Sequence, residues 1–364
     1  MKPAPKSRKP ETPWVVDSVI AGVDAFRRGR PVAIAGAGGT VLAYAVETLA
    51  PGVLGTLRTA PRLVLSHARA RTLKIRLYTP HVVALAVAKD MTPERLRAIA
   101  DPTDDLAFPL KGPFETLRDT LPEAYGAAVK LAKLAGLLPA ALAVTARGAA
   151  KGAVALAAAA VFAYDDEIVR TLKIVARARV PLAGAERTEL VSFRPADGGP
   201  EHYAIVVGAP PPAKPVLTRL HSECFTGDLL GSLKCDCGTQ LRGAIAAIQK
   251  AGGGVLLYLA QEGRGIGLIN KLRAYRLQDQ GFDTIDANER LGFAADERQY
   301  GIAARMLKLL GYKAVRLLTN NPHKVAALKA AGVAVTARVR HAFPDNEHNR
   351  AYLRTKAEKA GHLL

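Results

Sequence analysis

The spacing of apolar and polar residues divides the chain into two parts near residue 180. Before that point the sequence is rich in Ala and Leu, and its pattern predicts a helix over residues 16–28 and a strand over 31–35. The uncharged run from Gly152 to Tyr164 has 13 residues, short of the roughly 18 that a membrane-spanning helix needs. We therefore predict a buried Ala-rich helix there and no membrane span.

Beyond residue 180 short apolar strands alternate with amphipathic helices that end at glycine. Such alternation is typical of an α/β domain with loops at the carboxyl ends of its strands. We predict strands over residues 202–208, 216–223, 255–261 and 314–321, and helices over 238–251, 266–280, 297–310 and 323–331.

A length of 364 residues fits two domains. We expect a flexible basic tail over residues 1–13, one domain over 14–175 and a second over 176–364. The predicted fold class is α/β (α+β), with a mixed sheet and helices in the second domain.

The charge of the chain narrows the class of partner. There are 51 Lys and Arg against 32 Asp and Glu, a formal net charge of +19. Residues 1–180 carry 26 against 15 (+11) and the remainder 25 against 17 (+8), so the excess is not one basic arm. A polyanion is the expected partner: nucleic acid, an anionic membrane surface or a phosphorylated small molecule.

All three cysteines fall within 14 residues, at Cys224, Cys235 and Cys237. An odd number cannot form a complete disulfide framework, and this clustering favours a metal in a reducing compartment. Three thiolates would leave one zinc position open, as in catalytic sites, whereas His221 as a fourth ligand would close it. A redox pair and inert buried thiols are the remaining alternatives.

Three loops are rich in small or polar residues. Residues 36–41 follow a predicted strand, but Val41 stands where a dinucleotide-binding fingerprint needs glycine, so we predict a tight turn there. Residues 261–267 and 319–324 each join a strand to a helix, and both offer backbone N–H groups and a cation to an anion. Each of the latter two could also be a plain turn.

The second half resembles the GTP cyclohydrolase II family. The resemblance covers about residues 180–364, in the expected order, and rests on these motifs: RLHSECFTGD (219–228), SLKCDCGTQL (232–241), QEGRGIGLINK (261–271), LQDQGFDT (277–284), LGFAADER (291–298), LLTNNPHK (317–324) and TKAEKAGHLL (355–364). It implies a zinc-dependent hydrolase of riboflavin biosynthesis. The implied reaction converts GTP to formate, pyrophosphate and 2,5-diamino-6-(5-phospho-ribosylamino)pyrimidin-4(3H)-one.

The resemblance also implies roles for individual residues. Cys224, Cys235 and Cys237 would hold one Zn²⁺ per subunit, and Mg²⁺ would accompany GTP. The GTP contacts would be Arg219, Leu220, His221, Ser222, Glu223, Gln240, Glu262, Gly263, Arg264, Thr284, Thr319 and Lys324.

Three further positions match the family's catalytic residues. Tyr275 would lie near the ring-opening site, Asp296 would accept a proton, and Arg298 would attack the α-phosphorus. Arginine is a poor nucleophile because its pKa exceeds 12, so Arg298 could instead stabilise charge.

Residues 14–150 distantly resemble 3,4-dihydroxy-2-butanone 4-phosphate synthase, through AFRRGRPV (25–32) and AAVKLAKLAGLLPA (127–140). The acidic run that this family carries after its first strand is replaced by residues 35–44, which hold no carboxylate. Its His-Thr-Glu is replaced by residues 124–126, and its Cys-Glu by Val144 and Thr145. Since Mg²⁺ requires oxygen ligands, usually carboxylates, we predict a synthase-like domain without synthase activity, kept for dimerisation, stability or regulation.

Taken together, we expect a cytoplasmic homodimer that binds GTP and neither spans a membrane nor binds nucleic acid. Two alternatives stay open. One is a family member with an altered product, such as GTP hydrolysis without ring opening or pyrimidine catabolism. The other is a nucleic-acid-binding regulator that retains the fold, although aromatic residues for base stacking are scarce at 5%.

Overall fold

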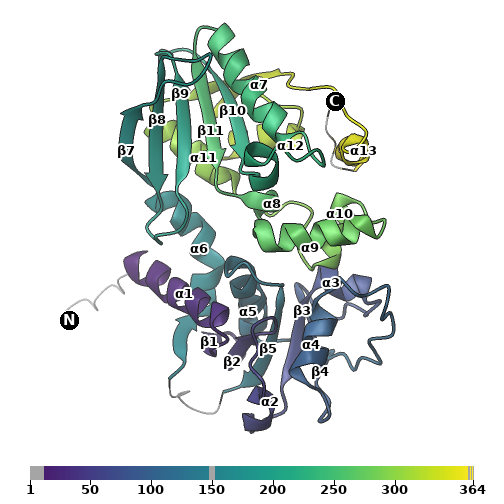
Figure 1. The fold of residues 1–364 in the computed structure, drawn as a ribbon. Helices are drawn as coiled ribbons and strands as arrows, with labels where there is room; N and C mark the ends of the chain where they lie inside the picture. Colours follow the sequence, from purple (N-terminus) through teal and green to yellow (C-terminus); the bar gives the residue numbers. More distant parts are fainter. Residues whose placement is uncertain (1–11, 147–151, 360, 362, 364) are drawn as a thin grey trace, which may run out of the picture. The chain divides into compact units, whose positions relative to one another are not determined.

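The computed structural model describes residues 12–146, 152–359, 361 and 363 (Figure 1). The expected tail over residues 1–13 lies outside the described residues except for Thr12 and Pro13, which begin a helix. The chain forms two compact units, one of residues 1–168 and 289–293 and the other of residues 169–288 and 294–364.

The first unit is built on a six-stranded sheet of order β4-β3-β5-β2-β1-β6. Only β1 and β6 pair in parallel, and the other neighbours are antiparallel. Its strands are β1 (Val32–Gly36), β2 (Gly39–Ala45), β3 (Arg62–Ser66), β4 (Val82–Ala86), β5 (Ala140–Thr145) and β6 (Val154–Ala157).

Helices α1 and α5 pack on this sheet and on each other (Figure 1). Their apolar faces join the strands in one core, with Phe26, Ile34 and Leu131 fully buried. The helices of this part of the chain are α1 (Thr12–Arg27), α2 (Val53–Thr56), α3 (His67–Thr72), α4 (Pro93–Ala100), α5 (Glu123–Leu134) and α6 (Ala158–Thr171).

The glycine-rich segment after the first strand is a β-hairpin. Gly36 pairs with Gly39, and β1 turns directly into β2 instead of leading into a helix. The φ angles of Gly38 and Gly39 are +84° and +110°, in the region that favours glycine. The predicted tight turn is therefore confirmed.

The Ala-rich helix predicted over residues 152–164 is wrong in its first part. Val154–Ala157 form strand β6, which pairs with β1, and helix α6 starts only at Ala158. An Ala-rich run carries little intrinsic information, because burial beside a strand overrides the helix propensity of alanine. Strand β7 (Lys173–Arg179) was also not predicted.

The second unit is built on a seven-stranded sheet of order β13-β12-β10-β11-β9-β8-β7. Strands β13, β12, β10 and β11 are parallel, and β11, β9, β8 and β7 pair in antiparallel fashion. The strands are β7, β8 (Thr188–Arg194), β9 (His202–Val207), β10 (Val216–Ser222), β11 (Gly254–Leu259), β12 (Ala314–Leu318) and β13 (Ala334–Val339).

Helices cover both faces of this sheet (Figure 1). On one face, α7 buries Ala244 and Ile248 against β10 and β11. On the other, α11 and α12 bury Met306, Leu307 and Leu328. The helices are η1 (a π-helix, Phe225–Leu229), α7 (Cys237–Lys250), α8 (Glu262–Gly265), α9 (Gly267–Asp279), α10 (Thr284–Arg290), α11 (Tyr300–Leu309), α12 (Pro322–Ala330) and α13 (Arg350–Glu358).

This three-layer arrangement explains why β10 is buried along six consecutive residues. It also brings the carboxyl ends of β10, β11 and β12 to one edge of the sheet. No helix among the described residues combines the length and the apolar character needed to cross a bilayer.

Candidate active site

The carboxyl ends of β10, β11 and β12 carry the segments that the motifs singled out. Cys224 follows β10, Glu262 follows β11, and Thr319 follows β12. Because these strands are parallel neighbours, the three segments open into a common pocket within the second unit. Helices α7, α9, α10, α12 and α13 and the loops that carry Arg298 and His341 supply the remaining walls.

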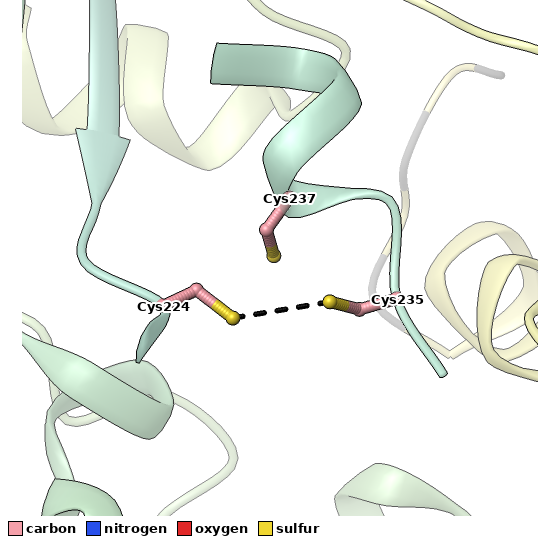
Figure 2. A group of neighbouring side chains, drawn as sticks. All are labelled: Cys224, Cys235 and Cys237. Carbon is pink, nitrogen blue, oxygen red and sulfur yellow. Dashed lines mark hydrogen bonds between the residues drawn. The ribbon is translucent and has the colours of Figure 1, made fainter. Parts of the chain in front are cut away.

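The three thiols form a cluster at one end of this pocket (Figure 2). Cys224 precedes the π-helix η1, Cys235 lies in the following loop, and Cys237 opens α7. Their sulfur atoms lie within 4.8 Å of one another, and the Sγ atoms of Cys224 and Cys235 are 3.8 Å apart. Two thiolates on a tetrahedral zinc with Zn–S bonds of about 2.3 Å would lie about 3.8 Å apart, so the cluster fits zinc.

A glycine makes this convergence possible. A Cβ on Gly227 would lie 2.7 Å from the sulfur of Cys235 and 3.1 Å from that of Cys224. A Cβ on Gly238 would meet the carbonyl oxygen of Gly227 at 2.2 Å. Any larger side chain would therefore push the thiols apart.

Lys271 of α9 supplies a positive charge beside the thiols. Its Nζ lies 3.1 Å from the sulfur of Cys224 and 2.8 Å from Oε1 of Glu262. Hydrogen bonds from the other two thiols, and then from Lys271, lower the pKa of Cys224. The hydrogen bond with Cys224, together with burial and the negative charge of Cys224, raises the pKa of Cys235 to about 11. A cation would therefore be needed to hold all three as thiolates.

His221 is not part of the metal-ligating group among the described residues. Its Nε2 lies 3.0 Å from both carboxylate oxygens of Asp228, and its ring stacks on Tyr258. Asp228 also accepts the backbone N–H of Cys224 and the hydroxyl of Tyr258. The structure therefore favours three thiol ligands over the alternative with His221, and Asp228 links His221 to the backbone N–H of Cys224.

Most residues predicted to contact GTP line this pocket. Its walls include Arg219, His221, Ser222, Glu223, Gln240, Glu262, Gly263, Arg264, Thr284, Thr319 and Lys324, together with Tyr275 and Arg298. Leu220 does not line it: the side chain is buried in the core, and its carbonyl accepts a hydrogen bond from Lys324 at 2.9 Å. Asp296 is not among the lining residues either, but it forms an ion pair with Arg298, which is.

The pocket has an excess of positive charge. Seven Lys and Arg line it, against two Glu. Burial lowers the pKa of Arg219 to about 10, and burial together with Arg219 and Arg298 lowers that of Lys324. Four buried polar atoms of the lining have no hydrogen-bond partner among the described residues: Nε of Arg219, Nδ1 of His221, Oγ of Ser222 and Nδ2 of Asn288. The excess of Lys and Arg side chains is suited to a polyanionic ligand.

The loop after β11 has an unusual backbone. Gly263, Arg264 and Gly265 have φ angles of +64°, +63° and +91°. A left-handed arginine is uncommon, and such strain is concentrated at functional sites. The turn is held by Glu262, whose carboxylate accepts the N–H groups of Gly263 and Phe225.

Arg298 and Asp296 form a two-pronged ion pair. Nε and one terminal nitrogen of Arg298 lie 2.8 and 2.6 Å from the carboxylate of Asp296, which also accepts the hydroxyl of Tyr300. Burial alone would raise the pKa of Asp296, but the hydrogen bonds and charge of Arg298 outweigh it and hold that pKa below its usual value. Burial also opposes the charge of Arg298, yet Asp296 raises the pKa of Arg298, so both groups are charged.

Several pocket residues were missed in the motifs. Lys271 lies within the quoted motif 261–271 but received no role, although its helical position places it four residues before Tyr275. Lys234, Asn320 and Lys356 likewise lie within the motifs 232–241, 317–324 and 355–364 and received no role. Asn288, His341 and Tyr352 lie outside the motifs and give no local signal.

Comparisons with known proteins agree with these motifs. A family model described as GTP cyclohydrolase II matches residues 173–340. The chain is 50% identical to GTP cyclohydrolase-2 of Azospirillum brasilense, in an alignment covering 99% of this chain and 97% of that protein. It is 61% identical to GTP cyclohydrolase-2 of Azotobacter vinelandii over 46% of this chain and 80% of that one.

The other similarities are more limited. Riboflavin biosynthesis protein RibBA of Bacillus mycoides is 58% identical over 45% of this chain and 41% of that protein. Among solved structures, RibBX, a two-domain 3,4-dihydroxy-2-butanone 4-phosphate synthase from A. baumannii, matches with a TM-score of 0.31 and 18% identity, covering 83% of this chain and 93% of that one. The near-complete match to the Azospirillum protein, with the thiol cluster and cationic loops inside the matched family region, shows that the chain belongs to the GTP cyclohydrolase II family.

Proposed function

We propose that this chain is a zinc-dependent GTP cyclohydrolase II that converts GTP to formate, pyrophosphate and 2,5-diamino-6-(5-phospho-ribosylamino)pyrimidin-4(3H)-one. The observation that carries the proposal is the meeting of a three-thiol cluster with an excess of cations in one pocket. The thiols suit a soft divalent metal, and the cations suit a triphosphate.

Cys224, Cys235 and Cys237 would hold the zinc. Held by these three ligands, zinc would supply Lewis-acid activation of a water molecule, lowering the pKa of that water to roughly 7. The close packing of the thiols around Gly227 supports this assignment, because the three sulfur atoms lie within 4.8 Å of one another.

Tyr275 would act beside the thiols as a neutral hydrogen-bond group. Its hydroxyl lies 3.4 Å from Oγ1 of Thr226, and burial raises its pKa. A protonated phenol can donate to a nitrogen or oxygen of the opening ring. Glu223 also lines the pocket, and burial followed by the charge of Glu262 raises its pKa.

Arg219, Arg264, Arg298 and Lys324 would bind the phosphates, and Mg²⁺ would accompany the nucleotide. Arg298 retains its proton because Asp296 raises its pKa, so we assign it to stabilising charge at the α-phosphate and not to nucleophilic attack. Asp296 would orient that guanidinium through the two-pronged pair.

The test is an assay of the zinc-loaded full chain with GTP and Mg²⁺, in which formate, pyrophosphate and the pyrimidine are each measured. All three should appear in equal amounts. Cys235→Ser should lose zinc and formate release while its circular dichroism spectrum is retained. Pyrophosphate without formate would favour hydrolysis without ring opening, and a fully active Cys235→Ser would refute the metal assignment.

A further inference from the structure

The C-terminal helix α13 is the part of the site to which no role has been assigned. Its residues Tyr352 and Lys356 line the pocket, although they lie far in sequence from the strand-end loops. Figure 1 shows α13 as a separate yellow helix near the C-terminus, outside both helical layers of the sheet. The helix is therefore an addition to the α/β scaffold that reaches the site.

Lys356 is held deep in this wall. The residue is 8% exposed, and its Nζ lies 2.8 Å from Oδ1 of Asp236, the residue between Cys235 and Cys237. Asp236 in turn accepts a hydrogen bond from the amide of Gln240, whose oxygen accepts one from Arg219. A continuous polar chain thus joins the C-terminal helix to the thiol loop and to a predicted phosphate-binding arginine.

Tyr352 lies one helical turn before Lys356, and its ring centroid is 4.3 Å from the ammonium. Residues four apart share a face of a helix, so both side chains reach the pocket together. The aromatic face stabilises the cation and limits where it can move.

The Lys356 ammonium has capacity that these contacts do not use. It carries three N–H donors, and within the described part of the chain Asp236 is the one hydrogen-bond acceptor found for it. Its side chain is 10% exposed, so the remaining donors are largely withdrawn from solvent and border the same pocket as Arg219, Arg298 and Lys324. An ammonium with unused donors in this position can bind an anionic oxygen of a ligand as well as Asp236.

We propose that α13 supplies two further residues of the nucleotide site: Lys356, which binds a phosphate oxygen of the nucleoside triphosphate, and Tyr352, which positions the Lys356 ammonium. The inference rests on the proposed function, since it takes GTP as the ligand. It adds a contact from outside the strand-end loops, and it accounts for the motif over residues 355–364, whose role the sequence did not explain.

The first test compares Lys356→Gln with Arg354→Gln in the full chain. Arg354 is exposed on the same helix, so its substitution removes the same charge without touching the pocket. Lys356→Gln should weaken binding of Mg²⁺–GTP about tenfold or more, measured by calorimetry and as a higher KM, because hydrogen bonds to charged groups have about this effect. Arg354→Gln should bind as the parent chain does. Equal affinity in the parent and Lys356→Gln would overturn the proposal.

A second variant separates phosphate binding from neutralisation of Asp236. In Lys356→Gln alone, the buried carboxylate of Asp236 loses the cation that neutralises it. The double variant Asp236→Asn, Lys356→Gln removes that carboxylate as well, so no unpaired charge is left at position 236. If Lys356 only neutralises Asp236, this double variant regains the parent affinity and the proposal is overturned. If Lys356 binds phosphate, the double variant keeps normal zinc content but still binds GTP about tenfold more weakly.

Pyrophosphate as a probe distinguishes failure of this inference from failure of the proposed function. Parent chain that binds neither pyrophosphate nor GTP contradicts both. Parent chain that binds both ligands, with Lys356→Gln unchanged for both, contradicts only the role of α13. Loss of affinity for pyrophosphate in Lys356→Gln, and not in Arg354→Gln, supports it. Tyr352→Leu should give a smaller loss of the same sign.

Discussion

The strand ends of the two sheets differ sharply in what they carry. In the second unit the ends of β10, β11 and β12 hold thiols, carboxylates and cations that face one pocket. In the first unit β1 ends in a hairpin whose loop, Ala37 and Gly38, has no functional side chain. Within the described residues, the cysteine cluster is the single group of His, Cys, Asp or Glu placed to hold a metal.

The hairpin of the first unit is closed by its neighbours. Oε2 of Glu123 accepts the backbone N–H of Ala37 at 3.0 Å, and a Cβ on Gly38 would lie 3.0 Å from the Cα of Pro122. The carboxylate of Glu123 therefore caps a turn. The comparison teaches that an α/β scaffold provides loops at strand ends, whereas activity depends on which side chains those loops carry.

The largest expected effect is at Arg298. Arg298→Gln should lower kcat at least about 100-fold, because it removes a fixed cation from the phosphate region and leaves Asp296 without its partner. Arg298→Lys should retain part of the activity, since the ammonium keeps the positive charge but lacks the two parallel N–H donors of the guanidinium. Steady-state formate release measures both, and a phosphorylated arginine found by mass spectrometry would contradict the assignment of Arg298 to charge stabilisation.

A glycine substitution in the thiol loop should have the next largest effect. Gly227→Ala places a methyl group 2.7 Å from the sulfur of Cys235, so zinc affinity should fall at least about tenfold. Gly55→Ala in α2 is the matched control, because no atom lies within 4 Å of its added methyl. Metal content after competition with a chelator measures the loss, and equal retention in the two variants would refute the close-packing argument.

A smaller effect is expected from acid, through His202 on β9. Burial lowers the pKa of His202 to about 4, and its Nδ1 accepts the backbone N–H of Ala260 at 3.0 Å, which requires a neutral ring. The unfolded chain has the ordinary pKa near 6.5, so it takes up the proton first as pH falls. The stability from His202 is complete above pH 6.5 and decreases from there toward pH 4, by about 2 kcal/mol at pH 5.

Urea unfolding at pH 7 and pH 5, for the parent chain and His202→Asn, isolates this effect. The parent should lose about 2 kcal/mol more than the variant, because Asn offers an acceptor that does not titrate. Hydrogen exchange should rise at pH 5 in peptides of β9 more than in those of β1 and β2, after correction for intrinsic rates. An identical pH dependence in both proteins would contradict the prediction.

The last prediction is that the first unit has no synthase activity. The full chain should form no dihydroxybutanone phosphate from ribulose 5-phosphate with Mg²⁺, because residues 35–44 carry no carboxylate and Glu123 is engaged with Ala37. A known synthase assayed in parallel is the control. Appreciable turnover would show that the first unit retains a synthase site, and would contradict the conclusion that its strand ends carry no catalytic side chains.

Much of the second unit could be predicted because its local signals agree with one another. The helix predicted over 238–251 is observed at Cys237–Lys250, and the strand predicted over 216–223 at Val216–Ser222. Glycines past the helix ends and continuous apolar strands both specify the same α/β order. In the first half, the composition of the Ala-rich run predicts a helix, whereas its first residues form strand β6, which the sequence analysis did not predict.

The roles of individual site residues stay predictions, but the structure explains why some could not be found from sequence. Lys356 is separated from Asp236 by 120 positions, and nothing in either local pattern relates them. The dimer, the magnesium requirement and the role of the first unit likewise remain predictions.

The sequence by itself determined the family, the thiol spacing and the loops that we predict to bind anions, because these depend on residue types within short segments. The tertiary structure decided which groups share one pocket, that His221 faces Asp228 and not the thiols, and that Lys356 reaches the thiol loop. The physical reason is that hydrogen bonds, burial and charge depend on distances in space, and the packing of parallel strands sets these distances between residues that are far apart along the chain.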